Sequence, residues 1–341
     1  MRMWEQPAQI LPVRVRPVAG ETVVSFAFRL ADANALTHPT TLLRALGEPA
    51  GAPPTRSWID KHDITLNPAA LHRLETFTGI PAPRLRKVLP TLAHTTIRAD
   101  PGRGKPMIRG HRSVQLREHC DECIARLPGH PRIRVRAKVA PQICRRHRRW
   151  VNTTPHRPHQ VDLSNTAGII RAHRRFDRLC SRTGDGDWTQ GQLQHADYIV
   201  REWSRSRPNH VHKHLHARWD QRETAMQSVS GPETGLLVLP EAVALAEVLC
   251  DLEWRRHVAM VDTNTELARF YSRVGRQLGQ SPNFGDRIAW TVYIDPLKSW
   301  VIQHRRNHQK TRDEFWRRVR THYPFNPYMN QAIYPSIRHF K

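Results

Sequence analysis

Cysteine and histidine side chains with metal-binding spacing lie between residues 119 and 151 of this 341-residue chain. Cys120 and Cys123 form a Cys-x-x-Cys pair, and Cys144 and His147 repeat the spacing as Cys-x-x-His. This spacing allows a tight turn to direct two ligand atoms at one cation, and three thiolates with one imidazole form a closed set for structural zinc. The sequence therefore predicts one structural Zn²⁺ site and indicates no open coordination position of the kind that a catalytic zinc keeps.

The fourth ligand has alternatives. Other histidines near the pairs are His119, His130 and His156. His147 is preferred because it completes the second pair. A separate run from His210 to His216 has a histidine at every second position. On a strand these side chains would share one face and could bind a metal, whereas on a helix they scatter; a solvated or phosphate-facing patch is the favoured interpretation.

Basic residues alternate with apolar ones between the two ligand pairs. From residue 132 to residue 139, Arg or Lys alternates with Ile, Val or Ala. This period of two predicts a strand with one basic face, and it favours a zinc ribbon in which a β hairpin connects the two pairs. The candidate DNA contacts in this region are Arg132, Arg134, Arg136, Lys138, Arg145, Arg146, Arg148 and Arg149.

A helix, a tight turn and a short basic helix are predicted between residues 67 and 90. Asn67 can cap a helix that begins at Pro68 and ends at Gly79. The candidate DNA contacts on the second helix are Arg84, Arg86 and Lys87. These are the parts of a helix-turn-helix motif. An ordinary helical hairpin has the same parts, so the sequence leaves both interpretations open.

The remaining pattern is mostly helical. Helices are expected within residues 20–36 and 38–47 and through most of residues 161–321, whereas residues 11–17, 48–57 and 99–113 are expected to be extended or loop segments. We therefore predict a mostly α fold with a small β zinc ribbon. Its expected domains are an N-terminal helix-turn-helix region (1–100), a central zinc ribbon (101–160) and a helical C-terminal domain (161–341).

The chain is strongly basic. Lys and Arg total 54 against 30 Asp and Glu, which gives a formal net charge of +24 with histidine neutral. A charge of this size indicates a polyanionic partner, because binding to phosphates releases condensed counterions. We expect that partner to be DNA. The excess of arginine over lysine is explained equally well by GC-rich codon usage.

The apolar and cysteine patterns indicate where the protein works. No run of about 18 apolar residues exists, so no membrane span is predicted, and the N-terminus lacks the continuous apolar region of a signal peptide. Three of the five cysteines belong to the metal-like pattern, which fits a reducing cytoplasm better than a disulfide framework. Cys180 and Cys250 lie in helical patterns and are expected to be small core residues.

An N-terminal motif precedes the two-helix segment and the paired ligands. It consists of Leu11-Pro12, Glu21, Ser25-Phe26, Arg29 and Asn34. The three features in this order resemble the TniQ/TnsD family of transposition target-selection proteins over about residues 11–150. Phe26 stands where the family commonly has tryptophan, and the second Cys-rich set that many members carry downstream is not visible in this sequence.

The resemblance implies a non-catalytic adaptor. Such proteins bind target DNA or a guide complex and recruit an AAA+ ATPase regulator, which in turn recruits the transposase. The expected partners are therefore DNA and an AAA+ ATPase, at the bacterial nucleoid. The sequence leaves open whether the chain forms a homodimer or joins a guide complex.

Two other functions are compatible with the sequence: a stand-alone site-specific DNA-binding protein, such as a regulator or replicon-end binder, and, with less support, a metal-dependent nuclease. A nuclease needs clustered carboxylates that hold Mg²⁺. Asp185 and Asp187 are expected in a turn, and the side chains of Asp251 and Glu253, two residues apart on a helix, diverge. No Gly-Lys-Ser/Thr phosphate loop exists, which excludes an NTPase. We therefore expect no enzymatic activity.

Overall fold

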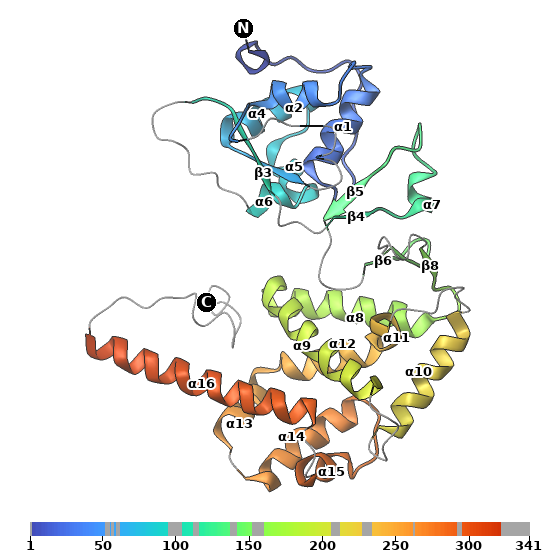
Figure 1. Cartoon of the computed structure of the whole chain (residues 1–341), viewed down its shortest axis with the longest axis vertical. Coiled ribbons are helices and arrows are strands. Elements are labelled where there is room, and N and C mark those ends of the chain that lie inside the picture. Colours follow the sequence, from blue (N-terminus) through green and yellow to red (C-terminus); the bar gives the residue numbers. More distant parts are fainter. Residues whose placement is uncertain are drawn as a thin grey trace. The chain divides into compact units, whose positions relative to one another are not determined.

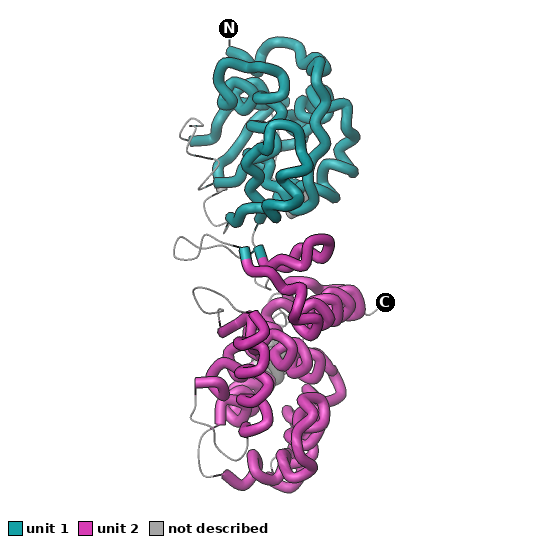
Figure 2. The backbone as a smooth tube through the Cα atoms, turned by 90° about the vertical axis from the view of Figure 1, so that its right-hand side faces the viewer, with its two compact units in different colours: residues 1–138, 151–160 teal, residues 139–150, 161–341 magenta. Residues whose placement is uncertain are grey.

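The computed structural model divides the chain into two compact units (Figure 1, Figure 2). Unit 1 comprises residues 1–138 and 151–160, and unit 2 comprises residues 139–150 and 161–341. The described residues are 2–51, 55, 58, 62–94, 104–111, 116–136, 142–151, 160–205, 212–226, 234–261, 263–291 and 295–321. They are mostly helical with small sheets, which confirms a mostly α fold, and none of their helices is long and apolar enough to cross a membrane.

Unit 1 combines short helices with two small sheets (Figure 1). Its helices are the 3₁₀ helix η1 (Met3–Glu5), α1 (Val23–Ala33), α2 (Thr40–Leu46), α4 (Pro68–Thr78), α5 (Ala82–Val88), α6 (Thr91–His94) and α7 (Asp121–Ile124). Its strands are β1 (Glu48–Pro49), β2 (Asp63–Leu66), β3 (Met107–His111), β4 (Leu116–Glu118) and β5 (Arg134–Arg136). Strand β3 is central in the first sheet, parallel to β1 and antiparallel to β2, and β4 pairs with β5 in the second.

Strand β3 corrects one expectation from the sequence. Residues 99–113 are predicted as a basic loop, but Met107–His111 pair with two strands. Ile108 of β3 and Ile64 of β2 are both fully buried. With a single buried side chain in a stretch rich in Gly and Pro, the alternation of apolar and polar residues that predicts a strand is too short to recognise. The strand therefore depends on its distant partners rather than on its local sequence.

Helix α1 is buried along most of its length. Residues 23–31 are all buried. Thr22 caps the helix, because its side chain accepts the Ser25 N–H at 3.1 Å. The Asp63 carboxylate of β2 accepts a second free N–H of the first turn, that of Val24, at 3.3 Å. The predicted helix that starts after Glu21-Thr22 is confirmed, and a capping carboxylate from the sheet adds to its local start signal.

A buried ion pair connects α1 to the segment before it. Glu21 is fully buried and Arg29 is 8% exposed. Arg29 donates from Nε to Glu21 Oε1 at 2.8 Å and from Nη2 to Glu21 Oε2 at 2.6 Å. The Ser25 hydroxyl donates to Oε1 at 3.0 Å, and the Val18 N–H donates to Oε2 at 2.9 Å. Each carboxylate oxygen therefore accepts two hydrogen bonds, which offsets much of the cost of burying the charge.

The same network positions strand β5. The Arg134 N–H donates to Ser25 Oγ at 3.0 Å. In the other direction, the Thr22 N–H donates to the Arg134 carbonyl at 3.0 Å, and Glu21 forms an antiparallel bridge with Val135. The N-terminal motif thus fixes the strand that follows the first cysteine pair, more than 100 residues along the chain.

Replacing Glu21 with Gln should destabilise the protein by about 3–5 kcal/mol, because the buried Arg29 guanidinium loses its carboxylate. Urea denaturation followed by circular dichroism measures the loss. Glu48→Gln is the matched control. Its pairs with Arg2 and Lys105 lie at the surface, where water screens the charges, so their loss should destabilise the protein far less than the loss of the buried pair. Equal losses for the two variants would show that the Glu21 network does not govern the stability of unit 1.

The capping residues in the sequence correctly predict where helix α4 begins and ends, and α5 follows the turn as expected. Asn67 Oδ1 accepts the Ala70 N–H at 2.9 Å, and Pro68 is the first residue of α4. Gly79 ends the helix with φ 65°, a left-handed conformation that glycine adopts without strain. The two helices and the turn between them are confirmed, whereas their use as a DNA-reading helix-turn-helix stays a prediction.

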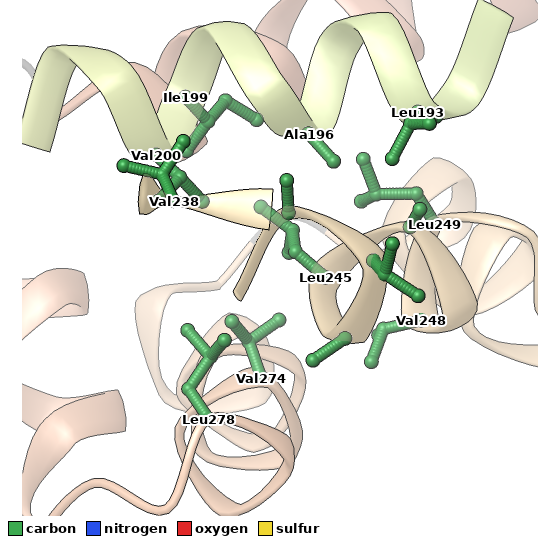
Figure 3. Close-up of a cluster of buried hydrophobic side chains, with 14 of the residues drawn as sticks. Leu193, Ala196, Ile199, Val200, Val238, Leu245, Val248, Leu249, Val274 and Leu278 are labelled. Atoms are coloured by element: carbon green, nitrogen blue, oxygen red, sulfur yellow. The ribbon is translucent and has the colours of Figure 1, made fainter. Parts of the chain in front are cut away.

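Unit 2 is helical with one small sheet. Its helices are α8 (Ala167–Thr183), α9 (Gly186–Arg205), α10 (Lys213–Met226), α11 (Thr234–Leu237), α12 (Leu239–Leu249), α13 (Leu252–Met260), α14 (Asn264–Gln277), α15 (Phe284–Trp290) and α16 (Pro296–Thr321). Its strands are β6 (Ile143–Cys144), β7 (Arg149–Trp150) and β8 (Val161–Asp162). Apolar side chains of α9, α12 and α14, among them Ile199, Leu245 and Val274, meet in its core (Figure 3). Cys250 is buried and Cys180 packs against the same core, as expected.

Helices α14 and α15 approach each other closely at two glycines. A Cβ on Gly275 would lie 2.8 Å from Phe284 Cδ1. A Cβ on Gly285 would lie 2.0 Å from Ser272 Oγ and 2.5 Å from the Ala268 carbonyl oxygen. These distances are shorter than carbon contacts allow. Both positions therefore need glycine if the two helices are to keep their separation.

A buried arginine connects α13 to α9 and α16. Arg255 is 2% exposed and donates from Nη1 to Gln192 Oε1 at 2.8 Å and to the Leu249 carbonyl at 2.7 Å. Its Nη2 lies 3.3 Å from His304 Nδ1, and the His304 ring stacks on Trp300 with centroids 5.0 Å apart. Burial is the main cause that lowers the pKa of His304 to about 3, and the charge of Arg255 is the second.

Acidification should destabilise the protein through His304. The folded pKa of His304 lies below the ordinary value of 6.5, so between these values the unfolded state binds more protons than the folded state. The free energy of unfolding therefore decreases as the pH is lowered through this range. Urea denaturation between pH 7 and pH 5 measures the slope. In His304→Gln the slope should decrease by up to about 1.4 kcal/mol per pH unit, the value for one proton. His72→Gln, at an exposed position, should keep the wild-type slope, and the same slope in both variants would contradict this role of His304.

Candidate metal centre

The first ligand pair lies in the connection between β4 and β5. These strands are antiparallel, with Arg117 opposite Val135, so the segment between them returns on itself. Cys120 directly precedes α7 and is 1% exposed. Its carbonyl accepts the N–H groups of Cys123 at 2.9 Å and Ile124 at 3.0 Å. This turn brings the two cysteines of the Cys-x-x-Cys pair together.

Gln160 holds the backbone on both sides of Cys120. Its side chain is buried, its Nε2 donates to the His119 carbonyl at 2.8 Å, and its Oε1 accepts the Asp121 N–H at 3.2 Å. Sequence reasoning missed this residue. A glutamine far along the chain has no spacing signal, and only the folded structure brings it to the cysteine turn.

The second ligand pair lies in the turn between β6 and β7. In the sheet β6-β7-β8, Cys144 is opposite Arg149. Cys144 Sγ lies 3.7 Å from His147 Nδ1. The strand residues Ile143 and Trp150 are buried in the core of unit 2. The turn is therefore anchored by apolar side chains on both of its strands.

The strand between the two pairs takes a different partner from the expected one. The sequence favours one β hairpin that connects the pairs. Strand β5 instead pairs with β4, which precedes the first pair, and β6 pairs with β7, which follows the second. Each pair therefore has a small sheet of its own. Part of the predicted strand, including Lys138, lies outside the described residues.

The structure brings the predicted ligands together. The group consists of Cys120, Cys123, Cys144 and His147. One ligand atom from each lies within 4.8 Å of the others. A Zn–S bond of about 2.3 Å places two sulfurs about 3.8 Å apart at a tetrahedral zinc, so small adjustments would let the group hold one ion. Within the described chain this is the only such His/Cys/Asp/Glu group, and neither His119 nor His130 belongs to it; His156 is not among the described residues.

The histidine run from His210 to His216 forms no metal group within the described part of the chain. His212 is 2% exposed, and its ring stacks on Trp203 with centroids 4.7 Å apart. Its Nε2 lies 3.5 Å from Asp295 Oδ2. The favoured solvated patch is therefore wrong for His212, because the start of α10 directs this ring into the core of unit 2. His210 lies outside the described residues.

Some of the predicted DNA contacts are exposed and have no ion pair within the described chain. They are Arg84, Arg86 and Lys87 of α5 and Arg146 and Arg148 of the β6–β7 turn. The others are more constrained. Arg132 Nε and Arg134 Nη1 lie 3.4 Å and 3.0 Å from Glu118 Oε1, Arg145 pairs with Asp177, and Arg136 and Arg149 are half-buried.

Two of the four acidic residues considered for a nuclease cap helices, and a third, Asp187, lies in the first turn of α9 rather than in the expected turn. Asp251 Oδ1 accepts the N–H groups of Glu253 at 3.0 Å and Trp254 at 3.3 Å at the start of α13. Asp185 Oδ1 accepts the Trp188 N–H at 2.9 Å at the start of α9. Asp251 therefore precedes its helix, which corrects the expected placement of Asp251 and Glu253 on one helix. Both capping aspartates have a structural use.

The comparison with protein families decides the identity. The model of the TniQ family matches residues 12–182, about half of the chain. The chain belongs to the TniQ family. The match includes the Glu21–Arg29 ion pair and all four grouped ligands, and TniQ proteins are associated with DNA transposition. Searches of curated proteins and of solved structures found no match.

The purified TniQ-family chain should carry about one divalent metal ion, held by the four grouped side chains. Cys120→Ser should lose most of this metal and melt at a lower temperature, because a ligand and a buried thiol are lost together. Elemental analysis and thermal unfolding measure both effects. Cys180→Ser changes a cysteine outside the group and should keep the ion. A metal-free wild type whose stability does not respond to a chelator would contradict the site.

Proposed function

We propose that this TniQ-family protein is a zinc-containing, DNA-binding adaptor that selects the target for DNA transposition. The family match over residues 12–182 carries the proposal. The adaptor has no enzymatic activity of its own and recruits an AAA+ ATPase, which brings the transposase to the chosen DNA. The capping roles of Asp185 and Asp251 support the absence of a nuclease site.

Zinc is the proposed ion because of the donor set. Three thiolates and one imidazole suit Zn²⁺, whereas Mg²⁺ and Ca²⁺ need oxygen ligands. Four protein ligands complete a tetrahedron, so no position is left for water or substrate. The proposed role is therefore structural. The strands around the two pairs are only two or three residues long, so a metal crosslink would add to the stability that their packing provides.

Helix α5 is the proposed DNA-reading element. Leu85 is fully buried and anchors the helix, while Arg84, Arg86 and Lys87 are exposed around it. A short helix that follows a tight turn and packs on a preceding helix is the arrangement by which helix-turn-helix proteins enter the major groove. Arginine forks also suit guanine edges and phosphates.

The second ligand turn is the next proposed contact. Arg146 and Arg148 are exposed there, whereas Arg132, Arg134 and Arg145 already pair with acids.

The domain boundaries 1–100, 101–160 and 161–341 stay predictions, as do the cytoplasmic, nucleoid-associated location and a homodimer or guide complex.

Replacing Arg84, Arg86 and Lys87 with Ala should weaken binding to duplex DNA about tenfold or more near physiological salt, and the slope of log K against log salt should fall by about 2–3. Fluorescence anisotropy at several salt concentrations measures both effects. The control variant carries Arg44→Ala, Arg109→Ala and Arg126→Ala, which remove three exposed charges elsewhere in unit 1. If the α5 variant and the control variant lose the same affinity, α5 is not the DNA-reading element. If the affinity of the wild type does not depend on salt, the protein does not bind DNA through phosphate contacts.

Two further measurements separate the adaptor from its alternatives. If the immobilised protein retains an AAA+ ATPase of a transposition system in the presence of ATP, the adaptor is supported. Selection of bound fragments from random duplex DNA then distinguishes site-specific targeting, which gives a sharp sequence motif, from guidance by a partner. A sharp motif without ATPase retention would favour the stand-alone DNA binder. Plasmid cleavage with Mg²⁺ that Asp251→Ala abolishes would favour the nuclease.

A further inference from the structure

Helix α8 carries a row of arginines that the sequence-based contacts do not include. Arg171, Arg174, Arg178 and Arg182 are exposed and lie three or four residues apart, so they share one face of the helix. The opposite face buries apolar side chains in the core of unit 2. These are Ile169, Ala172, Phe176 and Leu179. Because the apolar face is held in the core, the face that carries the arginines is held toward solvent.

The four charges have no acidic partner within the described chain. Neighbouring arginines differ in this respect: Arg175 of the same helix pairs with Glu247, and Arg145 pairs with Asp177. Like charges at these spacings repel one another. The fold thus maintains a row of uncompensated positive charge, which an anion on the row would stabilise.

The row continues onto the second ligand turn. Arg145 Nη2 of the turn contacts Asp177 Oδ2 of α8, and Ile143 and Trp150 pack in the same core as the buried face of α8. The turn adds the exposed Arg146 and Arg148, which also have no ion pair within the described residues. In Figure 1, β6 and β8 lie beside α8 within unit 2. One basic surface thus spans two elements with a shared core.

The length of the row matches a nucleic-acid backbone. The eleven steps along the helix from Arg171 to Arg182 rise by about 16 Å at about 1.5 Å each. B-DNA rises by about 3.4 Å along its axis for each phosphate of one strand, and the strand also winds around that axis. A straight helix of this length therefore reaches only a few successive phosphates of one strand. Arginine forks bind phosphate oxygens with two parallel hydrogen bonds, so the arginines of the row can contact neighbouring phosphates of a duplex that lies against this face.

The composition of the surface favours duplex DNA over other anions. None of the large exposed apolar side chains of the described chain lies on α8 or on the second ligand turn. A protein interface has an apolar centre, and binding of single strands uses aromatic side chains on which bases stack. A surface of arginines alone instead suits the regular phosphate backbone of a duplex.

We propose that Arg171, Arg174, Arg178 and Arg182, together with the second ligand turn, bind the sugar–phosphate backbone of duplex DNA. This inference rests on the proposed DNA-binding function and adds a second surface to it, in unit 2. The row contributes affinity without sequence preference, whereas α5 in unit 1 is the proposed reading element.

The test replaces the four arginines of the row with Gln in the full-length protein. Affinity for random-sequence duplex DNA should fall tenfold or more, and the loss should be the same for every sequence. The salt slope should decrease by up to about 3.6, which is about 0.9 for each of at most four lost phosphate contacts. The control replaces Arg256, Arg269, Arg276 and Arg287 with Gln. These are exposed residues of unit 2 outside the row, so this variant loses the same charge and should bind nearly as the wild type does.

A second measurement does not depend on how well the variant folds. A photo-crosslinking amino acid at Arg178 should attach to duplex DNA, and the same amino acid at Arg269 should not. Wild-type affinity and slope in the row variant, with no crosslink at Arg178, would overturn the surface while leaving DNA binding through α5 intact. Failure of the wild type to bind duplex DNA would overturn the proposed function as well. Preferential crosslinking to single strands or to an acidic protein would also overturn the duplex assignment.

Discussion

The buried Glu21–Arg29 ion pair is the interaction on which unit 1 depends. An isolated charge in such a site would cost several kcal/mol, yet here every carboxylate oxygen accepts two hydrogen bonds and Arg29 also donates to the Arg16 carbonyl. The pair needs helix α1, the segment before it and the strand β5 in their native places at once, because Ser25 links Glu21 to the Arg134 N–H. It therefore makes the first cysteine pair part of the N-terminal fold, and it gives a physical reason for the Glu, Ser and Arg positions of the family motif.

The sequence predicts structure best where a residue acts on its immediate neighbours, as helix caps and closely spaced metal ligands do. Asn67, Pro68 and Gly79 predicted both ends of α4, because caps act within a few residues of the helix end. The four metal ligands were predictable for a similar reason, since their spacing reflects the turn that holds them. Strand β3, the Gln160 contacts and the burial of His212 could not be predicted in this way. Each depends on a partner that is distant in the chain, so the residues next to it in the sequence give no signal of that partner.

The charge of the chain illustrates the difference between composition and structure. A net charge of +24 indicates an anionic partner but does not say which arginines meet it. The structure distinguishes them by their ion pairs. Arg222 and Arg175 pair with Glu241 and Glu247 and so stabilise the fold, whereas the exposed α8 row has no acidic partner among the residues that the structure describes. The basic alternation at residues 132–136 predicts a contact surface, yet two of its arginines, Arg132 and Arg134, share an ion pair with Glu118.

The close approach of α14 and α15 also restricts how the sequence can vary. Gly285 faces the backbone of α14, and Gly275 faces the Phe284 ring. Backbone atoms cannot move aside without separating the helices, so even the smallest side chain at Gly285 breaks the contact. Among relatives that share unit 2, glycine should persist at this position while the exposed residues around it change freely. A chain with another residue there would need a different C-terminal packing, so Gly285 can serve as a marker for relatives that keep this helical arrangement.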